Sequence, residues 1–247
     1  MSRVGLEASE SQSVGSPEWS FAVEGRAVAG WDWAVGPPDV RQLGSIRKVR
    51  SSTYSRNVPV HAFSMTTGDE LTLESGLEHQ LMMMLDRDKG VSWLVAQPFL
   101  LRWSPKKAHY PDLLSVGVDG SVTAWDARPA ELQDIDFNWK VEKTAEACTA
   151  RGWRHRVFPG LSRVEEVNLR WLSMARRQQP WMPAAQARLR ELTEGGQVTL
   201  GEVAAIDHEG YLLSTLWHLA WRGDLELDLA GRWGEDLPVV WATGDPS

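Results

Sequence analysis

One hairpin constrains the fold of this chain more than any other feature. The stretch HYPDLLSVGVDGSVTAWDARPAE, residues 109–131, reads as two strands joined by a glycine-containing turn, with Asp112 near its beginning and Asp126 near its end. Side chains alternate between the two faces of a strand, so the length of the loop decides whether these two carboxylates share a face. Acidic side chains on sheet interiors are rare unless they are paired, so the register of this hairpin bears on function as well as fold.

Two registers are possible. A two-residue turn at Asp119-Gly120 would set Asp112 opposite Ala127 and point its side chain away from that of Asp126. A three-residue loop, residues 118–120, places Gly120 in the left-handed conformation and sets Asp112 opposite Asp126 on one face. This second register also pairs apolar residues with each other: Val116 with Val122 and Leu114 with Ala124. We therefore predict the three-residue loop.

In that register the two carboxylates lie about 5 Å apart at the level of the backbone. Without a cation they would repel, and one would tend to hold a proton. Mg²⁺ is commonly bound by one or two protein carboxylates and keeps several waters, which suits hydrolysis of a phosphodiester. The hairpin therefore predicts a metal site, with Glu78 as a further candidate. The alternative is a solvent-facing polar end in which Asp126 and Arg128 pair with other surface charges.

The surrounding pattern indicates a mixed α/β domain. LTLESGLEHQLMMMLD is an amphipathic helix, and two short strands, the hairpin, a second helix, the strand WRHRVF and a third helix follow it. This order predicts one domain over residues 58–178. Residues 1–57, rich in Gly, Ser and Pro, are expected to be a flexible or extended segment.

Residues 180–247 read as a separate acidic module. Three short helices followed by a hairpin are typical of a winged-helix domain. This part holds four Arg and no Lys against eleven Asp and Glu, a net charge of −7 that equals the charge of the whole chain. Such a surface would repel phosphates, so we expect it to dock a protein partner, with Trp217 and Trp221 as candidate anchors.

Composition sets wider limits. There is one cysteine, Cys148, so no disulfide can form within the chain and no zinc-type cluster is present. No basic-then-apolar leader and no apolar run of about 18 residues appears. We therefore expect a cytoplasmic protein with no membrane contact.

At this point the motifs show a resemblance. YPD, followed 14 residues after its Asp by DAR, is similar to the PD-(D/E)xK nuclease motif. Together with ESGLEHQLMMMLD, AQPF, GWRHRVF, NLRWL and the lead-in SRNVPVHAFSMTTGDELTLESGLE, the set resembles the TnsA-like endonuclease subunit of heteromeric transposases, actinobacterial type. The resemblance covers about residues 55–178.

The resemblance implies a restriction-endonuclease-like fold and a metal-dependent DNA endonuclease that nicks transposon 5′ ends. It implies Mg²⁺ or Mn²⁺ as cofactor. The implied partners are double-stranded DNA, a DDE-type transposase and an AAA+ ATPase regulator. Glu78 matches the helix carboxylate, Asp112 the first acidic position and Asp126 the second, all three as metal ligands, and Arg128 stands where the motif has lysine.

Arg128 separates two hypotheses. Arginine stays protonated and cannot act as a base, although it can stabilise charge on a phosphoryl oxygen. It is compatible with a metal-hydroxide mechanism, and it also fits a non-catalytic DNA-binding and assembly subunit. We expect His79 and His109 to be partly exposed polar side chains, with a general-base role as the alternative. Candidate contacts to the DNA backbone are Lys106, Lys107, Arg50 and Arg56.

Overall fold

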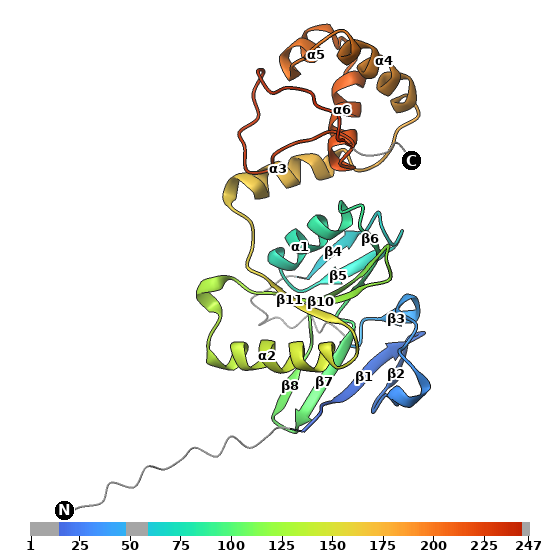
Figure 1. Ribbon diagram of the computed structural model, residues 1–247, viewed down its shortest axis with the longest axis vertical. Coiled ribbons are helices and arrows are strands. Elements are labelled where there is room, and N and C mark those ends of the chain that lie inside the picture. Colours follow the sequence, from blue (N-terminus) through green and yellow to red (C-terminus); the bar gives the residue numbers. More distant parts are fainter. Residues whose placement is uncertain (1–14, 48–58, 244–247) are drawn as a thin grey trace, which may run out of the picture.

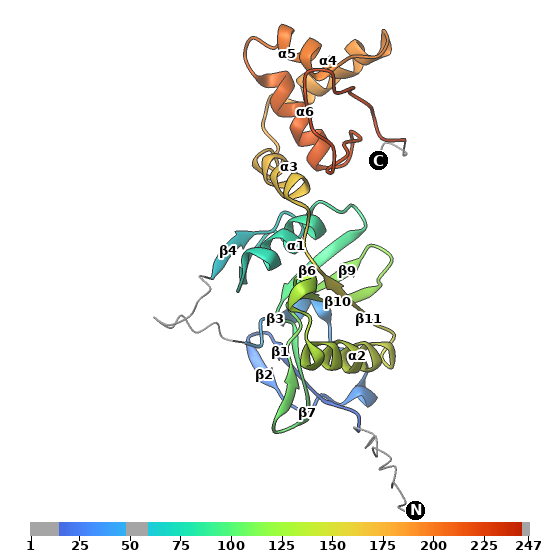
Figure 2. The same ribbon diagram turned by 90° about the vertical axis from the view of Figure 1, so that its left-hand side faces the viewer.

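The computed structural model describes residues 15–47 and 59–243 (Figures 1 and 2). The strands are β1 Glu18–Val23, β2 Arg26–Val28, β3 Leu43–Gly44, β4 Val60–Phe63, β5 Glu70–Leu73, β6 Val91–Ala96, β7 Phe99–Ser104, β8 Lys107–His109, β9 Leu113–Gly117, β10 Val122–Ala127 and β11 Arg154–Phe158. The α-helices are α1 Gly76–Asp86, α2 Ile135–Thr149, α3 Arg163–Met174, α4 Met182–Glu194, α5 Leu200–Ile206 and α6 Tyr211–Trp221. Three short 3₁₀ helices are η1 Trp33–Val35, η2 Val40–Gln42 and η3 Ala130–Leu132.

A four-stranded sheet in the order β11-β10-β9-β6 forms the centre of the α/β part. The β6–β9 and β9–β10 pairs are antiparallel, and β10 runs parallel to β11. Helices cover both faces: Leu81 of α1 packs in one hydrophobic cluster with Leu113 of β9, while Cys148 of α2 packs in the other with Leu114. Because consecutive β9 residues pack in two different hydrophobic clusters, one on each side of the sheet, both faces of this sheet are buried.

The β9–β10 hairpin has the predicted register. Val116 pairs with Val122 and Leu114 with Ala124, and the amide of Gly117 donates to the carbonyl of Ser121 at 2.7 Å. Residues 118–120 form the loop, and Gly120 has φ +80°. The three-residue loop is therefore confirmed.

The expectation of a flexible or extended N-terminal segment is wrong over residues 15–47. There β1 pairs with β2, β3 and β7, which gives a second sheet in the order β2-β1-β7-β8. Trp19 and Phe21 of β1 are buried in the cluster that also contains Cys148 of α2. Their alternation at every second residue is the strand signal that the Gly, Ser and Pro content obscured.

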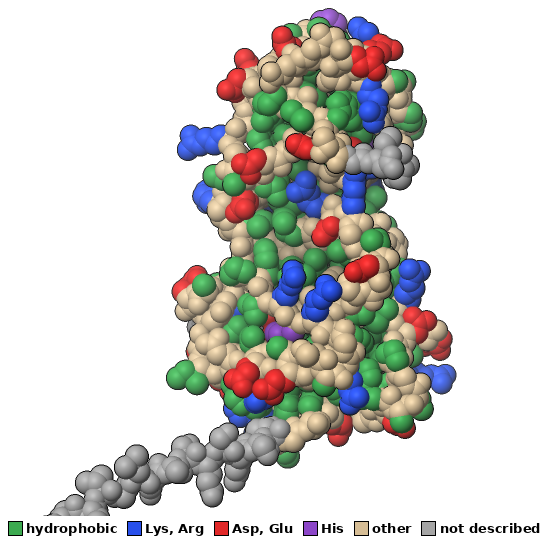
Figure 3. Space-filling view, in the orientation of Figure 1, with side chains coloured by type: hydrophobic (Ala, Val, Ile, Leu, Met, Phe, Trp, Pro, Cys, Tyr) green, Lys and Arg blue, Asp and Glu red, His purple; other side chains and the backbone are tan. Residues whose placement is uncertain are grey.

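The C-terminal part continues from the α/β part without a break in the core. Leu169 and Leu172 of α3 lie in the same hydrophobic cluster as α1 side chains and Leu219 of α6. After α6, one isolated bridge, Leu225 with Trp241, and two flanking backbone hydrogen bonds join the two segments of the predicted final hairpin, which is therefore shorter than expected. Figure 3 shows hydrophobic side chains open on the face of this part, with charged groups around them. None of the helices in the described ranges is long and apolar enough to cross a membrane.

Candidate functional site

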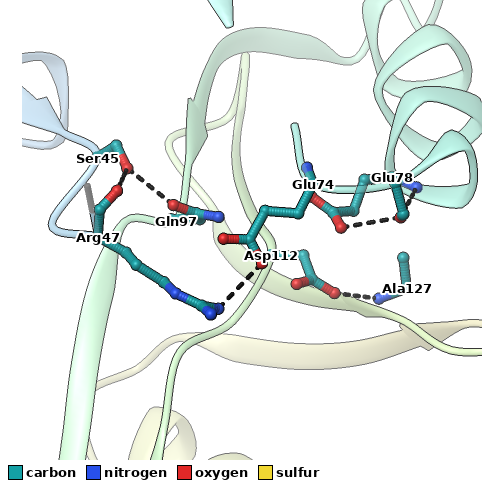
Figure 4. A network of polar contacts seen from close by, with 8 residues as sticks. Ser45, Arg47, Glu74, Glu78, Gln97, Asp112 and Ala127 are labelled. Atoms are coloured by element: carbon teal, nitrogen blue, oxygen red, sulfur yellow. Dashed lines mark hydrogen bonds and ion pairs between the residues drawn. The ribbon is translucent and has the colours of Figure 1, made fainter. Parts of the chain in front are cut away.

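An acidic site, made by Glu74, Glu78 and Asp112, lies where the start of α1 meets the start of β9 (Figure 4). Ser75 caps α1, accepting from the amide of Glu78 at 3.1 Å, and its hydroxyl donates to one carboxylate oxygen of Glu78 at 2.8 Å. The amide of Glu74 donates to the other oxygen at 2.8 Å. Glu78 is thus folded back on the helix start and is only 5% exposed.

Asp112 enters the site at the point where the β9–β10 pairing ends. Its amide donates to the carbonyl of Trp125 at 2.9 Å, and its carbonyl accepts from the amide of Gln97 at 2.8 Å. One carboxylate oxygen accepts from the amide of Ala127 at 2.7 Å. The main chain therefore fixes Asp112 on three sides and leaves its second oxygen without a partner in the described residues.

The two inner carboxyls both favour the neutral form. Burial raises the pKa of Asp112 well above its ordinary value, the nearby charges of Glu78 and Asp126 raise it further, and the hydrogen bond from Ala127 opposes the shift. Burial also raises the pKa of Glu78, against the hydrogen bonds from Glu74 and Ser75. A bound cation would reverse both shifts, since it favours the charged forms.

The third carboxyl, Glu74, is the outer member of the site. Its carboxylate forms an ion pair with Arg47 at 3.0 Å, and the Arg47 guanidinium lies 5.6 Å from the ring centre of Tyr110. Arg47 belongs to the N-terminal segment, so that segment contributes a cation to the edge of the acidic site.

Asp126 has different partners. Nε2 of His109 lies 3.1 Å from one of its oxygens and Nε2 of His155 lies 2.9 Å from the other, and Asp126 is 2% exposed. Nδ1 of His109 in turn lies 2.7 Å from the hydroxyl of Thr144 on α2. We call Asp126, His109 and His155 the histidine–aspartate cluster.

Two opposing effects act on Asp126. Burial by itself would raise its pKa, but the hydrogen bonds and charges of His109 and His155 outweigh burial and lower it. Asp126 is therefore ionised in the folded protein, and both histidines donate to it through Nε2. The expectation that His109 is partly exposed is wrong, because its ring is buried between Asp126 of β10 and Thr144 of α2; the burial of His79 is intermediate.

The structure thus brings together two of the three predicted metal ligands. Glu78 and Asp112 share the acidic site, whereas histidines engage both oxygens of Asp126. The predicted register holds as far as Leu113 opposite Trp125, and the ladder does not extend to the predicted pair of Asp112 with Asp126, because the amide of Asp112 also bonds the carbonyl of Trp125. In residues 15–47 and 59–243 no group of three or more His, Cys, Asp or Glu side chains is arranged to hold a metal. Two carboxyls with raised pKa values do match the donor set that Mg²⁺ uses with water.

Arg128 points to α2. Its Nε donates to the carbonyl of Leu132 at 2.9 Å, and its guanidinium lies 5.5 Å from the ring centre of Phe137. Within the described ranges its terminal nitrogens form no hydrogen bond and no ion pair with a carboxylate. They remain able to contact an anion.

Of the residues predicted to contact DNA or a protein partner, some are exposed, some lie outside the described residues and one is buried. Lys106 and Lys107 lie where β7 turns into β8, and Lys107 pairs with Asp136 at 3.2 Å and lies over Trp139. Arg50 and Arg56 fall outside the described residues. Trp217 keeps exposed surface and stacks on Trp233 at 5.5 Å, but Trp221 is 3% exposed. The prediction of Trp221 as a partner anchor is therefore wrong, because α6 turns it into the core.

Sequence reasoning missed His155 and Arg47 as neighbours of these sites. A signal existed for His155: it alternates with Trp153 on one strand face, and Trp153 is buried. No local pattern links Arg47 to Glu74, since 27 residues separate them. No protein-family model and no curated protein matches this chain.

Proposed function

We propose that this chain is a Mg²⁺- or Mn²⁺-dependent DNA endonuclease that nicks transposon 5′ ends as one subunit of a heteromeric transposase. The observation that carries the proposal is the pairing of Glu78 with Asp112. Helix α1 and strand β9 hold these two carboxyls beside each other, and no basic side chain of the described residues forms an ion pair with either. Two ionised carboxylates so placed repel each other unless one holds a proton or a cation binds between them.

The order of elements supports the proposal. A helix, three antiparallel strands, a crossover helix and a strand parallel to the third correspond to α1, β6, β9, β10, α2 and β11. This is the order expected of a restriction-endonuclease-like core, with β7 and β8 as an insertion. Helices α4 to α6 and the bridges that follow are compatible with a winged-helix module, which we propose docks the AAA+ ATPase regulator or the DDE-type transposase.

We assign a different role in the proposed reaction to each residue of the site. Glu78 and Asp112 would hold the cation, which when bound supplies charge neutralisation and a water of lowered pKa. The amide of Ala127 fixes one carboxylate oxygen of Asp112 at 2.7 Å and leaves the other for a ligand. Asp126 acts as a positioning residue, since its contacts with His109 and His155 tie β10 to β8 and β11.

Arg128 would bind rather than transfer a proton. A guanidinium stays charged, so Arg128 cannot be the base, but its free terminal nitrogens could stabilise the charge on a phosphoryl oxygen. Its contacts with Phe137 and the carbonyl of Leu132 hold the side chain against η3 and α2.

A second candidate function rests on Asp126. If its ion pairs with the two histidines persist on DNA, the site has two acidic ligands instead of three, which favours a non-catalytic subunit that binds double-stranded DNA and assembles the complex. The geometry around Arg128 is the same under both functions, so activity alone separates them.

A nicking assay on transposon-end DNA tests the proposal, with the partner transposase and the ATPase present and Mg²⁺ or Mn²⁺ supplied. Asp112→Asn and Glu78→Gln should each lower the nicking rate at least about 100-fold, because each removes a charged ligand worth several kcal/mol in the transition state. Glu24→Gln, at an exposed carboxylate in the β1–β2 turn, is the matched control and should nick normally.

Equal nicking by wild type and Asp112→Asn would overturn the assignment of the site. Wild-type protein that supports assembly on DNA without nicking, in a complex whose other subunits are active, would favour the non-catalytic function instead. The nicking assay of the Arg128→Lys variant then shows whether the motif lysine restores cleavage.

A further inference from the structure

A cavity of about 570 Å³ lies at the junction between the α/β part and the C-terminal helices. It is bordered by the end of α1, the β4–β5 turn, the start of β6, the segment after α3 and the end of α6. We call it the junction cavity. Its volume is in the range of pockets that hold small molecules, and it is far from the acidic site because it lies at the opposite end of α1.

Cations dominate the wall of the junction cavity. The lining includes four basic side chains, Arg87, Lys89, Arg176 and Arg222, and two acidic ones, Asp86 and Asp88. Asp224 outside the lining pairs with Lys89 at 2.6 Å and Arg222 at 3.1 Å. Among the described residues, no carboxylate lies within ion-pair distance of Arg87 or Arg176.

The acidic lining residues are already satisfied. Asp86 accepts from the Ser64 hydroxyl at 2.6 Å and from the amides of Met65 and Thr66 at 2.9 and 2.8 Å. Asp88 accepts from the amide of Gly90 at 2.8 Å. These carboxylates therefore stabilise the turns around the cavity, and neither forms an ion pair with Arg87 or Arg176, although the charge of Asp88 acts on Arg87. In the described part of the chain, each guanidinium donates only to a backbone carbonyl, Arg87 to Ala220 and Arg176 to Ser173.

Three buried nitrogen atoms of this wall have no hydrogen-bond partner in the described ranges. They are Nε of Arg87, Nε of Arg176 and Nε2 of His218. Buried polar groups without a partner are rare in folded proteins, so three of them in side chains that line one cavity mark it as a candidate polar site. A side-chain rotation at the two guanidiniums would present N–H donors to an oxyanion in the cavity.

The Nε2 atom of His218 needs a different kind of partner, a hydrogen-bond donor. Its Nδ1 donates to the carbonyl of Ala175 at 2.8 Å, since a carbonyl can only accept. Burial lowers the pKa of His218, against the raising effect of that hydrogen bond, so the ring is neutral near pH 7. Its Nε2 is therefore an acceptor, and His218 is 4% exposed. An unprotonated oxyanion cannot satisfy this atom, whereas a hydroxyl group can.

We propose that the junction cavity binds a small phosphate ester that also carries a hydroxyl group, such as a sugar phosphate or a nucleotide. The phosphate oxygens are bound by Arg87 and Arg176, with Arg222 at the rim, and a hydroxyl of the ligand donates to Nε2 of His218. A ligand held this way joins α1 to α6 across the junction and stabilises the two parts in their present arrangement.

Calorimetric titration of the full chain at pH 8 tests the proposal with three probes: methyl phosphate, ribose 5-phosphate and adenosine monophosphate. We expect the two hydroxyl-bearing probes to bind at least about tenfold more tightly than methyl phosphate, the effect of one buried hydrogen bond. Arg176→Gln should weaken all three by at least about tenfold, because it removes a charge-assisted contact. His218→Phe should remove only the preference for hydroxyl-bearing probes.

Arg188→Gln is the matched control, since Arg188 is an exposed α4 residue paired with Glu191 outside the cavity. It should bind every probe as wild type does. Circular dichroism verifies that each variant is folded, and Arg222→Gln, at an exposed rim position, repeats the test of charge without touching a buried group. Failure of all three probes to bind wild type at millimolar concentration, or binding that is unchanged in both Arg176→Gln and Arg222→Gln, would overturn the proposal.

The experiment uses no DNA and measures no cleavage. Its outcome is therefore independent of the proposed nuclease function, and either can fail while the other stands.

Discussion

At the scale of the residue, Asp112 links stability to the proposed metal. Because its folded pKa is raised above the unfolded value, the folded state is most favoured below the unfolded pKa and loses stability as pH rises through the folded pKa. Asp112→Asn keeps an oxygen that can accept from Ala127 and removes the charge. We expect the variant to unfold at a higher temperature than wild type at pH 8, with no difference at pH 3.

Thermal unfolding with and without 10 mM Mg²⁺ completes this test. The cation should raise the unfolding temperature of wild type at pH 8 and leave Asp112→Asn unchanged, because only the charged form binds it. An equal rise in both proteins would place the binding elsewhere.

Asp126, also at the scale of the residue, has its pKa shifted in the opposite direction to that of Asp112. Its folded pKa is lowered, so its hydrogen bonds with His109 and His155 stabilise the protein above the unfolded pKa, and this contribution is lost as pH falls through the folded pKa. Asp126→Asn replaces the acceptor of two buried N–H donors with an amide whose oxygen can accept from only one of them, and it should cost about 1–3 kcal/mol at pH 7. Urea unfolding measures the change, with the exposed Asp236→Asn as control. A loss below about 1 kcal/mol would mean that the cluster contributes little.

At the scale of the element, the sequence predicts what depends on neighbours along the chain. The β9–β10 register follows from alternation and one glycine, and α1 follows from its apolar stripe and the Ser75 cap. The direction of Asp126 does not follow, because it depends on His155, which belongs to a strand 29 residues further along the sequence. The β1 strand was hidden because its partner, β7, is also remote in sequence.

Gly120 tests the register of the β9–β10 hairpin. Its φ is +80° and no atom lies within 4 Å of the position a Cβ would take, so the only cost of a side chain there is conformational. Gly120→Ala should lower the free energy of unfolding by about 1–2 kcal/mol, and Gly120→Asn by less. Gly76→Ala, at the helical start of α1, should raise it by about 0.4–1 kcal/mol. Equal effects of the two alanines in urea unfolding would contradict a left-handed conformation at Gly120.

At the scale of the whole molecule, α3 couples the two parts. Its buried face contacts α1 on one side and α6 on the other, and Arg87 of α1 donates to the carbonyl of Ala220 at 3.1 Å across the same junction. The acidic site and the junction cavity lie at opposite ends of α1. Helix α1 is therefore the element that spans from the junction to the acidic site.

Leu172 tests this coupling, since it is fully buried on α3 within the hydrophobic cluster shared by α1 and α6. Because these parts share one core, urea unfolding followed by circular dichroism and by tryptophan fluorescence should give coincident transitions. Leu172→Ala should move both transitions together to lower urea, with a loss of about 2–5 kcal/mol. Val167→Ala, on the exposed face of the same helix, should change stability by less than about 0.5 kcal/mol. Two separate transitions in wild type would show that the C-terminal helices unfold independently, and the path along α1 would then carry no coupling.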